Sequence, residues 1–227
     1  MRVLAIETSM GRTSVAVTAA RQGEPARVKR LEAVRGQAEQ LIPLIGTLMA
    51  EAGLAFAGLD RIAVSIGPGG FSGIRTGVAA ARAFGLAAKL PVVGATSFTI
   101  MAAAYEKAGH AKGAYGLAAP AGLNAVFCQI LKPGREAVTD IVAMPQADCA
   151  AFFNGRADGL SGPASSALID GGFVALPLVA PDLFPDALTL AELAPSLSPA
   201  RDLPTPFYVR PPDAKPQKRN IIARKDE

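Results

Sequence analysis

The sequence predicts an α/β protein of two lobes, the first complete and the second shortened. In residues 1–107 the hydrophobic pattern passes through three strands and then alternates between helix and strand, in the order β-β-β-α-β-α-β-α. Residues 116–144 begin with strands again, but prolines interrupt the pattern beyond them. We therefore expect a first lobe at residues 1–109, a second lobe at 110–205, and a C-terminal segment at 206–227.

The first elements are three strands. Residues 3–6 form a short apolar run typical of a buried strand, and residues 13–18 alternate as a returning strand does. The polar stretch between them contains Gly11 and predicts a hairpin turn. Residues 27–34 can add a third antiparallel strand.

The rest of the first lobe alternates between helix and strand. Apolar residues recur with helical spacing from residue 37 to residue 54, and Pro43 lies early in that helix, where a missing N–H is tolerated. Thr96 and Ser97 are suited to cap the last helix. The expected elements are a helix at 37–54, a strand at 61–66, a helix at 71–88, a strand at 91–95 and a helix ending at about residue 107.

Three antiparallel strands followed by this alternation match one half of the ribonuclease-H-like fold, which actin and the sugar kinases contain twice. The strands expected at 116–119, 125–131 and 140–144 begin a second copy of the unit. The predicted fold class is therefore actin-like, with a degenerate second lobe.

A glycine-dense loop begins at residue 67 and joins the 61–66 strand to the helix that follows it. Such a junction either aims backbone N–H groups at an anion or leads into a tightly packed helix. The loop lacks the Gly-Lys-Ser/Thr sequence of a nucleotide-binding P-loop. Two interpretations stay open: a structural loop, and a contact with phosphate or a partner.

The helix after this loop carries small residues at every fourth position. A glycine inside a helix costs about 1 kcal/mol relative to alanine, so the stripe predicts that another helix packs unusually close. We interpret the stripe, together with part of the 39–54 helix, as a partner interface. Its expected residues are Leu41, Ile45, Gly73, Ile74, Gly77, Ala81 and Gly85.

The turn of the first hairpin is a second candidate site. Glu7, Thr8 and Ser9 occupy the position at which actin-like ATPases keep an acidic residue and a phosphate-binding turn. A carboxylate there could orient a magnesium-bound water. The alternative is a turn satisfied by its own hydroxyl groups. We expect no cofactor on the isolated chain, with ATP and Mg present only within a complex.

Composition restricts the chemistry further. His110 is the only histidine in 227 residues and lies in a linker-like stretch, which rules out the paired histidines of a zinc protease. Cys128 and Cys149 are the only cysteines and are expected to be buried free thiols. With one histidine and two cysteines, we expect no metal site. No apolar run reaches signal-peptide or membrane-spanning length, so we expect a cytoplasmic protein with no membrane partner.

The end of the chain is basic and interrupted by prolines. Residues 210–227 contain six basic and three acidic side chains, within a chain of net charge +4. A solvated extension and a contact with nucleic acid both fit this composition. The segment just before it, residues 206–210, is expected to pack against the body of the protein.

Five motifs follow one another along the chain: Ile6-Glu7-Thr8-Ser9, Ser14-Val15-Ala16-Val17, Leu41-Ile42-Pro43, the glycine loop, and Pro206-Phe207-Tyr208-Val209-Arg210. The glycine loop is the most specific of them, with Gly67-Pro68-Gly69 followed by Phe71-Ser72-Gly73-Ile74-Arg75. In this order the motifs resemble the bacterial TsaB (YeaZ) proteins, and the resemblance is strongest over residues 1–105.

The resemblance implies a subunit of the machinery that places threonylcarbamoyl on the adenosine next to the anticodon of tRNAs reading ANN codons. In that family such a chain is not the transferase. It is similar to its partner TsaD, which carries the metal and the nucleotide, and it supports TsaD as a heterodimer joined through helices of the N-terminal domains. A TsaE-like ATPase is the third component, and tRNA is bound through the assembled complex. Whether the free chain forms a homodimer is left open.

Two departures from the family pattern favour a non-catalytic scaffold. Gln37 stands where relatives commonly have histidine, and residues 120–127 lack the aspartate and arginine that relatives commonly carry at the start of the second lobe. Aspartate and arginine are residue types that hold a metal-bound water or a phosphate. The alternative function is an actin-like ATPase or kinase that uses Glu7 and the glycine loop.

Overall fold

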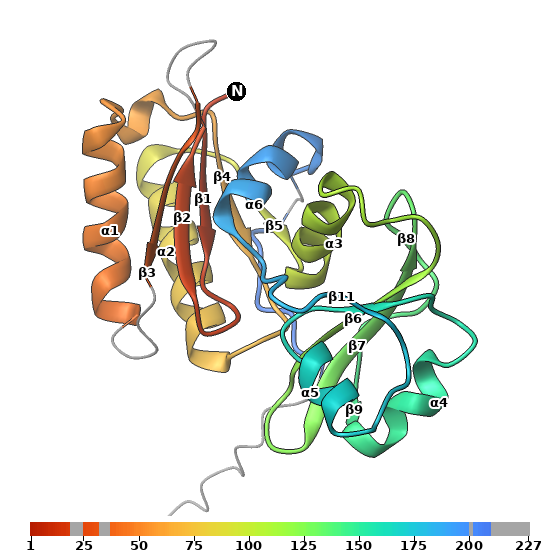
Figure 1. Ribbon diagram of the computed structural model, residues 1–227. Helices are drawn as coiled ribbons and strands as arrows, with labels where there is room; N and C mark the ends of the chain where they lie inside the picture. The colour runs from red at the N-terminus through yellow and green to blue at the C-terminus, as the bar shows by residue number, and fades with distance from the viewer. Residues whose placement is uncertain (19–24, 32–36, 200–201, 210–227) are drawn as a thin grey trace, which may run out of the picture.

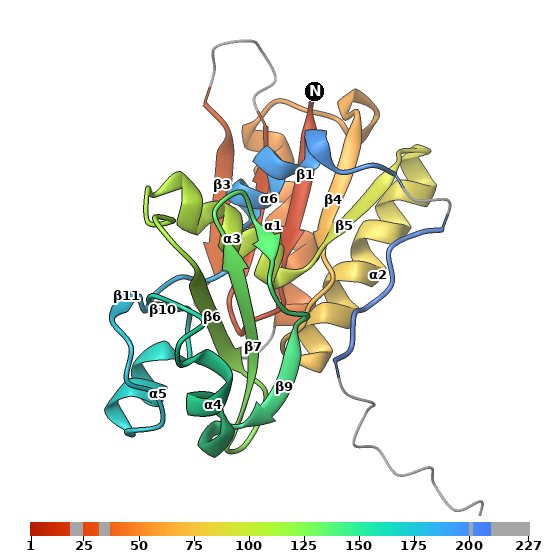
Figure 2. The same cartoon turned by 90° about the vertical axis from the view of Figure 1, so that its right-hand side faces the viewer.

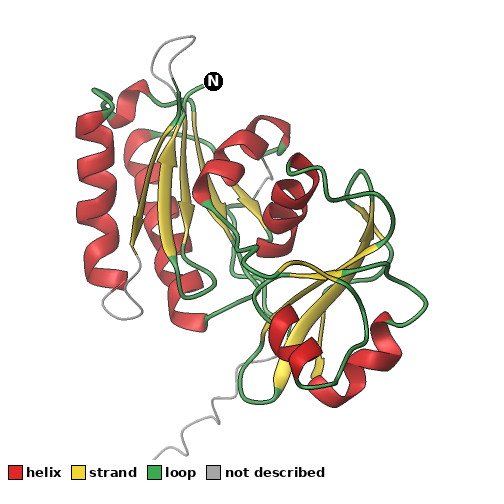
Figure 3. Cartoon of the chain, viewed as in Figure 1, coloured by secondary structure: helices red, strands yellow, loops and turns green. Residues whose placement is uncertain are grey.

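Figure 1 shows two α/β lobes in the computed structural model, which describes residues 1–18, 25–31, 37–199 and 202–209. Each lobe has its own sheet with helices packed beside it (Figure 3). The basic tail from residue 210 and the end of the third expected strand lie outside the described residues. The two-lobed α/β architecture predicted from the sequence is confirmed.

The first sheet has five strands in the order β3-β2-β1-β4-β5. β1 pairs antiparallel with β2 and parallel with β4, so it lies in the middle of the sheet and is buried along its whole length. The predicted hairpin is confirmed, with Ile6 opposite Val15. The strands are β1 (Val3–Glu7), β2 (Thr13–Val17), β3 (Arg27–Leu31), β4 (Arg61–Ser65) and β5 (Val92–Ala95).

Helices cover both faces of this sheet (Figure 1). α1 (Gln37–Glu51) and α2 (Phe71–Ala88) lie on one face, and α3 (Ser97–Lys107) and α6 (Ala187–Leu193) lie on the other. Alternate side chains of β1 therefore enter two different cores. Leu4 and Ile6 pack with α1 and α2, whereas Val3 and Ala5 pack with α6.

The predicted cap at the start of α3 is confirmed. Thr96 caps α3, because its hydroxyl oxygen accepts a hydrogen bond from the Thr99 N–H at 3.0 Å. Pro43 lies within α1 at its seventh residue, one turn later than the position at which proline is tolerated best. Short 3-10 turns occur at Phe56–Gly58, Gln146–Asp148 and Ala194–Ser196.

The expected lobe boundary at residue 205 is wrong, because the chain returns to the first lobe at α6. Ala187 and Leu190 are fully buried against the first sheet, and the Ala187 N–H donates to the Ser14 hydroxyl at 2.9 Å. Figure 2 shows α6 lying across the sheet beside α3. Both faces of this sheet are apolar, and residues 1–109 provide α3 alone for the second face, so a later segment covers the remainder.

The second sheet has the order β11-β10-β6-β7-β8, and β9 pairs with residues Ala125–Cys128 of β7, before the residues that pair with β8. The two strands expected at 116–119 and 125–131 are confirmed, and they pair antiparallel with Ala118 opposite Cys128. The strands of this sheet are β6 (Tyr115–Pro120), β7 (Ala125–Lys132), β8 (Glu136–Ala137), β9 (Val142–Pro145), β10 (Leu160–Ser161) and β11 (Leu178–Ala180), with helices α4 (Cys149–Phe153) and α5 (Ser165–Asp170).

The region beyond residue 145 is more regular than its sequence suggested. It contains four short elements of the second lobe before the chain leaves for α6. Strands of two or three residues and helices of five or six are too short to show a hydrophobic period. Their order comes from a shared core around Phe153 and Leu160, which are fully buried.

The residues singled out by composition lie as expected. Cys128 and Cys149 are buried free thiols whose Sγ atoms lie 3.9 Å apart. His110 is exposed, with its ring 5.3 Å from that of Tyr105. No described helix is long and apolar enough to cross a membrane.

Candidate functional site

The glycine loop closes tightly onto the turn of the first hairpin. The Gly70 N–H donates to the Ser9 carbonyl oxygen at 2.6 Å, and the Thr8 hydroxyl donates to the Gly73 carbonyl at 2.7 Å. A Cβ atom at Gly69 would overlap the Ser9 carbonyl. The two sequence-predicted sites are therefore neighbours, and their backbones occupy the space between them. This arrangement supports the structural interpretation of the loop.

The small-residue stripe of α2 faces the protein's own sheet. A Cβ at Gly77 would overlap the Thr8 hydroxyl, and one at Gly85 would overlap Val92. Ala81, between them, is fully buried. The stripe does allow close approach, as predicted, but the neighbour is the sheet of the same chain and not a second helix.

This placement corrects the expected partner interface. All seven of its residues are buried within the first lobe, so they cannot meet a partner directly. Leu41, Ile45 and Ile74 belong to the core between the sheet and the two helices. The seven buried residues are Leu41, Ile45, Gly73, Ile74, Gly77, Ala81 and Gly85.

The faces of α1 and α2 that point away from the sheet carry exposed apolar and small residues. Ile42 is 50% exposed and Leu86 is 81% exposed. A Cβ added at Gly46 would meet no atom within 4 Å, so this face of α1 is open. We call this surface the α1–α2 outer face; it comprises Ile42, Gly46 and Ala50 of α1 and Ala79, Ala83 and Leu86 of α2.

The sequence of α2 contains a second small-residue stripe, which lies on the outer face of the helix. Ala79 and Ala83 repeat the four-residue spacing of Gly77 and Ala81, displaced by two positions. Two small-residue stripes thus run along one helix. Glycine is costlier in a helix than alanine, so the glycine stripe marks the side under the tighter steric constraint, which is the sheet.

Glu7 is enclosed by its own turn. It is 1% exposed, and its Oε1 atom accepts hydrogen bonds from the Ser9 N–H and the Ser9 hydroxyl, both at 2.6 Å. Thr8 and Ser9 are equally buried. These contacts correspond to the alternative of a turn satisfied by its own hydroxyl groups.

The second oxygen of Glu7 is the unusual feature of this turn. Oε2 is buried and has no hydrogen-bond partner among the described residues. Burial raises the pKa of this carboxyl above its usual value of 4.5, and the nearby Ser65 hydroxyl and the hydrogen bonds from Ser9 offset only part of the effect. The folded protein therefore favours the protonated form of Glu7.

The Glu7→Gln variant should be more stable than the wild type at neutral pH. Folded Glu7 retains a proton that the unfolded chain releases above pH 4.5, so the wild type loses about 1.4 kcal/mol per pH unit from there up to the folded pKa. Glutamine keeps the acceptor for Ser9 and cannot ionise. Urea titrations from pH 4 to 8 should show the variant's advantage growing as pH rises.

The matched control is Glu136→Gln, which alters an exposed carboxylate in the second lobe. Its stability should follow that of the wild type at each pH. A Glu7→Gln curve parallel to the wild-type curve would contradict the buried, protonated carboxyl.

The C-terminal segment is fixed to the glycine loop and to α2 over residues 206–209, as expected, whereas residue 210 lies outside the described residues. The Phe207 N–H donates to the Ile66 carbonyl at 2.8 Å. Arg75 donates from Nε to the Tyr208 hydroxyl at 2.9 Å, while its guanidinium lies 3.6 Å from the centroid of the Phe71 ring. The arginine of the glycine-loop motif therefore anchors the C-terminal motif.

Among the described residues, no cluster of side chains is suited to hold a metal ion.

Comparison with known proteins agrees with this fold. The family model described as TsaD, tRNA N6-adenosine threonylcarbamoyltransferase, matches residues 31–176, more than half of the chain. The tRNA threonylcarbamoyladenosine biosynthesis protein TsaB of Haemophilus influenzae is 35% identical over 107 residues, covering 47% of this chain and 44% of that protein. The Escherichia coli protein of the same name is 29% identical over 102 residues, covering 45% and 43%. The chain thus spans less than half the length of these curated relatives.

A solved structure matches over almost the whole chain. YeaZ from Pseudomonas aeruginosa has a TM-score of 0.72 at 26% identity, covering 91% of this chain and 99% of that one. The two lobes and these matches define an actin-like protein of the TsaD type. Within that class, the chain belongs to the TsaB (YeaZ) family.

Proposed function

We propose that this chain is a non-catalytic scaffold subunit in the biosynthesis of threonylcarbamoyladenosine in tRNA, and that it docks on a TsaD-type transferase. Its relatives in Haemophilus influenzae and Escherichia coli are tRNA threonylcarbamoyladenosine biosynthesis proteins, which supports this pathway. The observation that supports a scaffold is the apolar surface left open on α1 and α2, while Glu7 is enclosed in its own turn. A TsaE-like ATPase and tRNA would join through the assembled complex.

The α1–α2 outer face is the proposed contact surface. Exposed Leu86 and Ile42 supply apolar area, and the small residues Gly46, Ala79 and Ala83 allow the partner's helices to approach closely. A contiguous apolar patch exposed on a protein surface commonly marks a site that a partner buries. The same face could pair with a second copy of the chain when the transferase is absent.

Replacing Leu86 by glutamate should weaken binding to the TsaD-type subunit at least thirtyfold. The variant would lose the buried apolar contact and place a charge in the interface, a cost of about 2 kcal/mol or more. The test co-expresses the chain with the TsaD homologue of its own genome and measures affinity by titration calorimetry. Leu123→Glu is the matched control, because Leu123 is 93% exposed but lies on the second lobe.

Two results would contradict the proposal in different ways. Equal binding by the Leu86→Glu variant and the wild type would place the interface elsewhere on the chain. No binding of the wild-type chain would remove the scaffold function itself. The ATPase alternative would be reinstated by Mg-ATP turnover above about 1 per second that disappears in the Glu7→Gln variant.

A further inference from the structure

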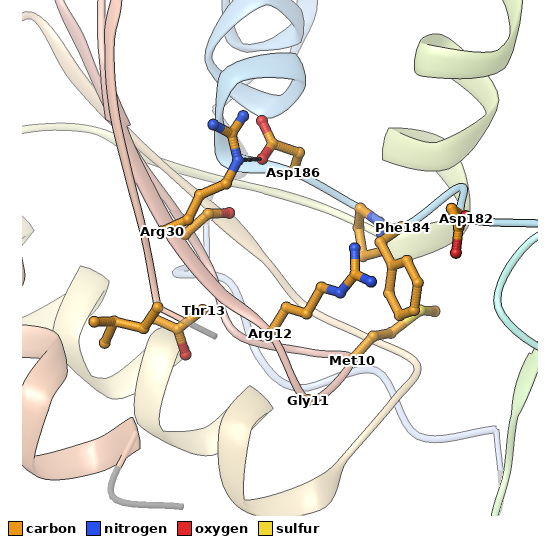
Figure 4. Close-up of a pocket in the computed structure, with 11 residues that line it drawn as sticks. Met10, Gly11, Arg12, Thr13, Arg30, Asp182, Phe184 and Asp186 are labelled. Carbon is orange, nitrogen blue, oxygen red and sulfur yellow. Dashed lines mark hydrogen bonds and ion pairs between the residues drawn. The ribbon is translucent and has the colours of Figure 1, made fainter. Parts of the chain in front are cut away.

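A cavity of about 780 Å³ lies beside the tip of the β1–β2 hairpin (Figure 4). Its walls are hairpin residues 10–14, Arg30 and Leu31 of β3, and Asp182, Phe184, Pro185 and Asp186 from the segment that leads into α6. Cavities that bind small ligands commonly measure about 300–1,000 Å³. Neither Glu7 nor the glycine loop lines this cavity, so the cavity is distinct from the contact between the Glu7–Ser9 turn and the glycine loop.

Arg12 is held in this cavity by an aromatic ring. Its guanidinium carbon lies 3.5 Å from the centroid of the Phe184 ring, as Figure 4 shows. A guanidinium stacked on a ring keeps its N–H groups directed outward in the plane of the fork. Arg12 makes no ion pair within the described part of the chain. It is therefore an ordered cation whose hydrogen-bond donors are available.

Arg30 is a second cation in the same cavity, and its position is also fixed. Its Nε atom donates to Asp186 Oδ2 at 2.8 Å. The other carboxylate oxygen of Asp186 accepts the Leu188 N–H at 2.9 Å and caps α6. Both oxygens of Asp186 are thus engaged, while the terminal nitrogens of Arg30 have no hydrogen-bond partner in the described ranges.

The rest of the cavity wall is partly polar and partly apolar, because Thr13, Ser14, Asp182 and Asp186 line it together with an apolar group. Met10, Leu31 and Pro185 line it beside the Phe184 ring. Asp182 is exposed and is drawn beyond that ring in Figure 4, where water screens its charge from Arg12. The cavity therefore offers two fixed guanidinium groups next to an apolar surface.

We propose that this cavity binds a small organic oxyanion, a phosphate ester or a carboxylate attached to an apolar or planar body. The oxygens of the anion would accept hydrogen bonds from Arg12 and Arg30, for which bidentate recognition is favourable. The body of the ligand would lie against Met10, Leu31 and Pro185. This binding site is additional to the proposed docking on a TsaD-type subunit.

The test is titration calorimetry of the full chain with four probes. Adenosine 5′-monophosphate and benzoate each combine an oxyanion with a planar body, adenosine lacks the anion, and inorganic phosphate lacks the body. We expect saturable binding of the monophosphate, of benzoate, or of both, with adenosine and inorganic phosphate at least tenfold weaker. Which of the two binds identifies a phosphate ester or a carboxylate as the natural group. Failure of both at about 1 mM would overturn the proposal.

Variants assign the binding to this cavity. Arg12→Gln should weaken the bound probe at least tenfold, and Phe184→Ala should weaken it severalfold because Arg12 loses its support. Arg156→Gln is the matched control: Arg156 is exposed and also lies over a ring, 5.3 Å from that of Phe152, but outside the cavity. Equal weakening by Arg12→Gln and Arg156→Gln would show nonspecific attraction and overturn the assignment.

Two further measurements keep this test independent of the others. Arg12 is exposed, so thermal melting of the Arg12→Gln variant should match that of the wild type, and a lowered melting temperature would assign Arg12 to folding instead. The variant should also bind the TsaD-type subunit with unchanged affinity, since Arg12 is not part of the α1–α2 outer face. Loss of probe binding can therefore be distinguished from loss of docking.

Discussion

Replacing Gly77 by alanine should destabilise the folded chain by about 1–3 kcal/mol, the usual cost of overpacking a buried site. The added methyl group would overlap the Thr8 hydroxyl, which is itself buried and bonded to the Gly73 carbonyl at 2.7 Å. Either α2 moves away from the sheet or this hydrogen bond breaks. Urea denaturation of the wild type and the variant measures the difference directly.

Gly46→Ala is the matched control for this substitution. Gly46 also lies inside a helix, but a Cβ at that position meets no atom within 4 Å. Alanine should therefore stabilise the chain there by up to about 1 kcal/mol, through helix propensity alone. Opposite signs for the two glycine-to-alanine changes are the expected result.

A double variant tests the mechanism. Thr8→Ala removes the hydroxyl that the new methyl group would meet, so Gly77→Ala should cost less when Thr8 is already alanine. A coupling of about 0.5–3 kcal/mol is typical of residues in contact. If Gly77→Ala leaves stability unchanged, or costs the same in both backgrounds, the stripe is not packed against the hairpin turn.

Truncating the chain after residue 186 should prevent the first lobe from folding. Leu190 and Leu193 lie in the core formed on the second face of the first sheet, and complete burial of each contributes about 1.5–3 kcal/mol. The truncation also removes the carbonyls of Ala194 and Leu197, which accept hydrogen bonds from Arg61. Domains are typically stable by only about 5–15 kcal/mol, so these combined losses are comparable with the whole.

The control truncation ends the chain after residue 209, which keeps α6 and the contacts of Phe207 and Tyr208. It should melt cooperatively, close to the full chain, in circular dichroism and calorimetry. The 1–186 chain should instead be insoluble or show no cooperative transition. A cooperative transition in the 1–186 chain would mean that α6 is dispensable to the first lobe.

The first half of the fold could be predicted because its signals are local. Alternation at residues 13–18 and helical spacing at 37–54 each depend on a single element burying one side. The short elements around Phe153 and Leu160 had no such signal, because an element of a few residues gains its order from the core that it joins. The position of α6 was missed for a related reason: the surface that it covers is assembled from strands more than 90 residues earlier.

The sequence by itself determined the family, the order of the elements to residue 107, the cap at Thr96 and the hairpin turn at Gly11. It also indicated that the α2 stripe allows a close approach, because three glycines on one face of a helix lower its stability unless a close contact offsets the cost. Only the tertiary structure decided that the close neighbour is Thr8 of the same chain and that Glu7 is enclosed. A periodic pattern identifies which residues share a face, but the chain's packing decides what that face meets.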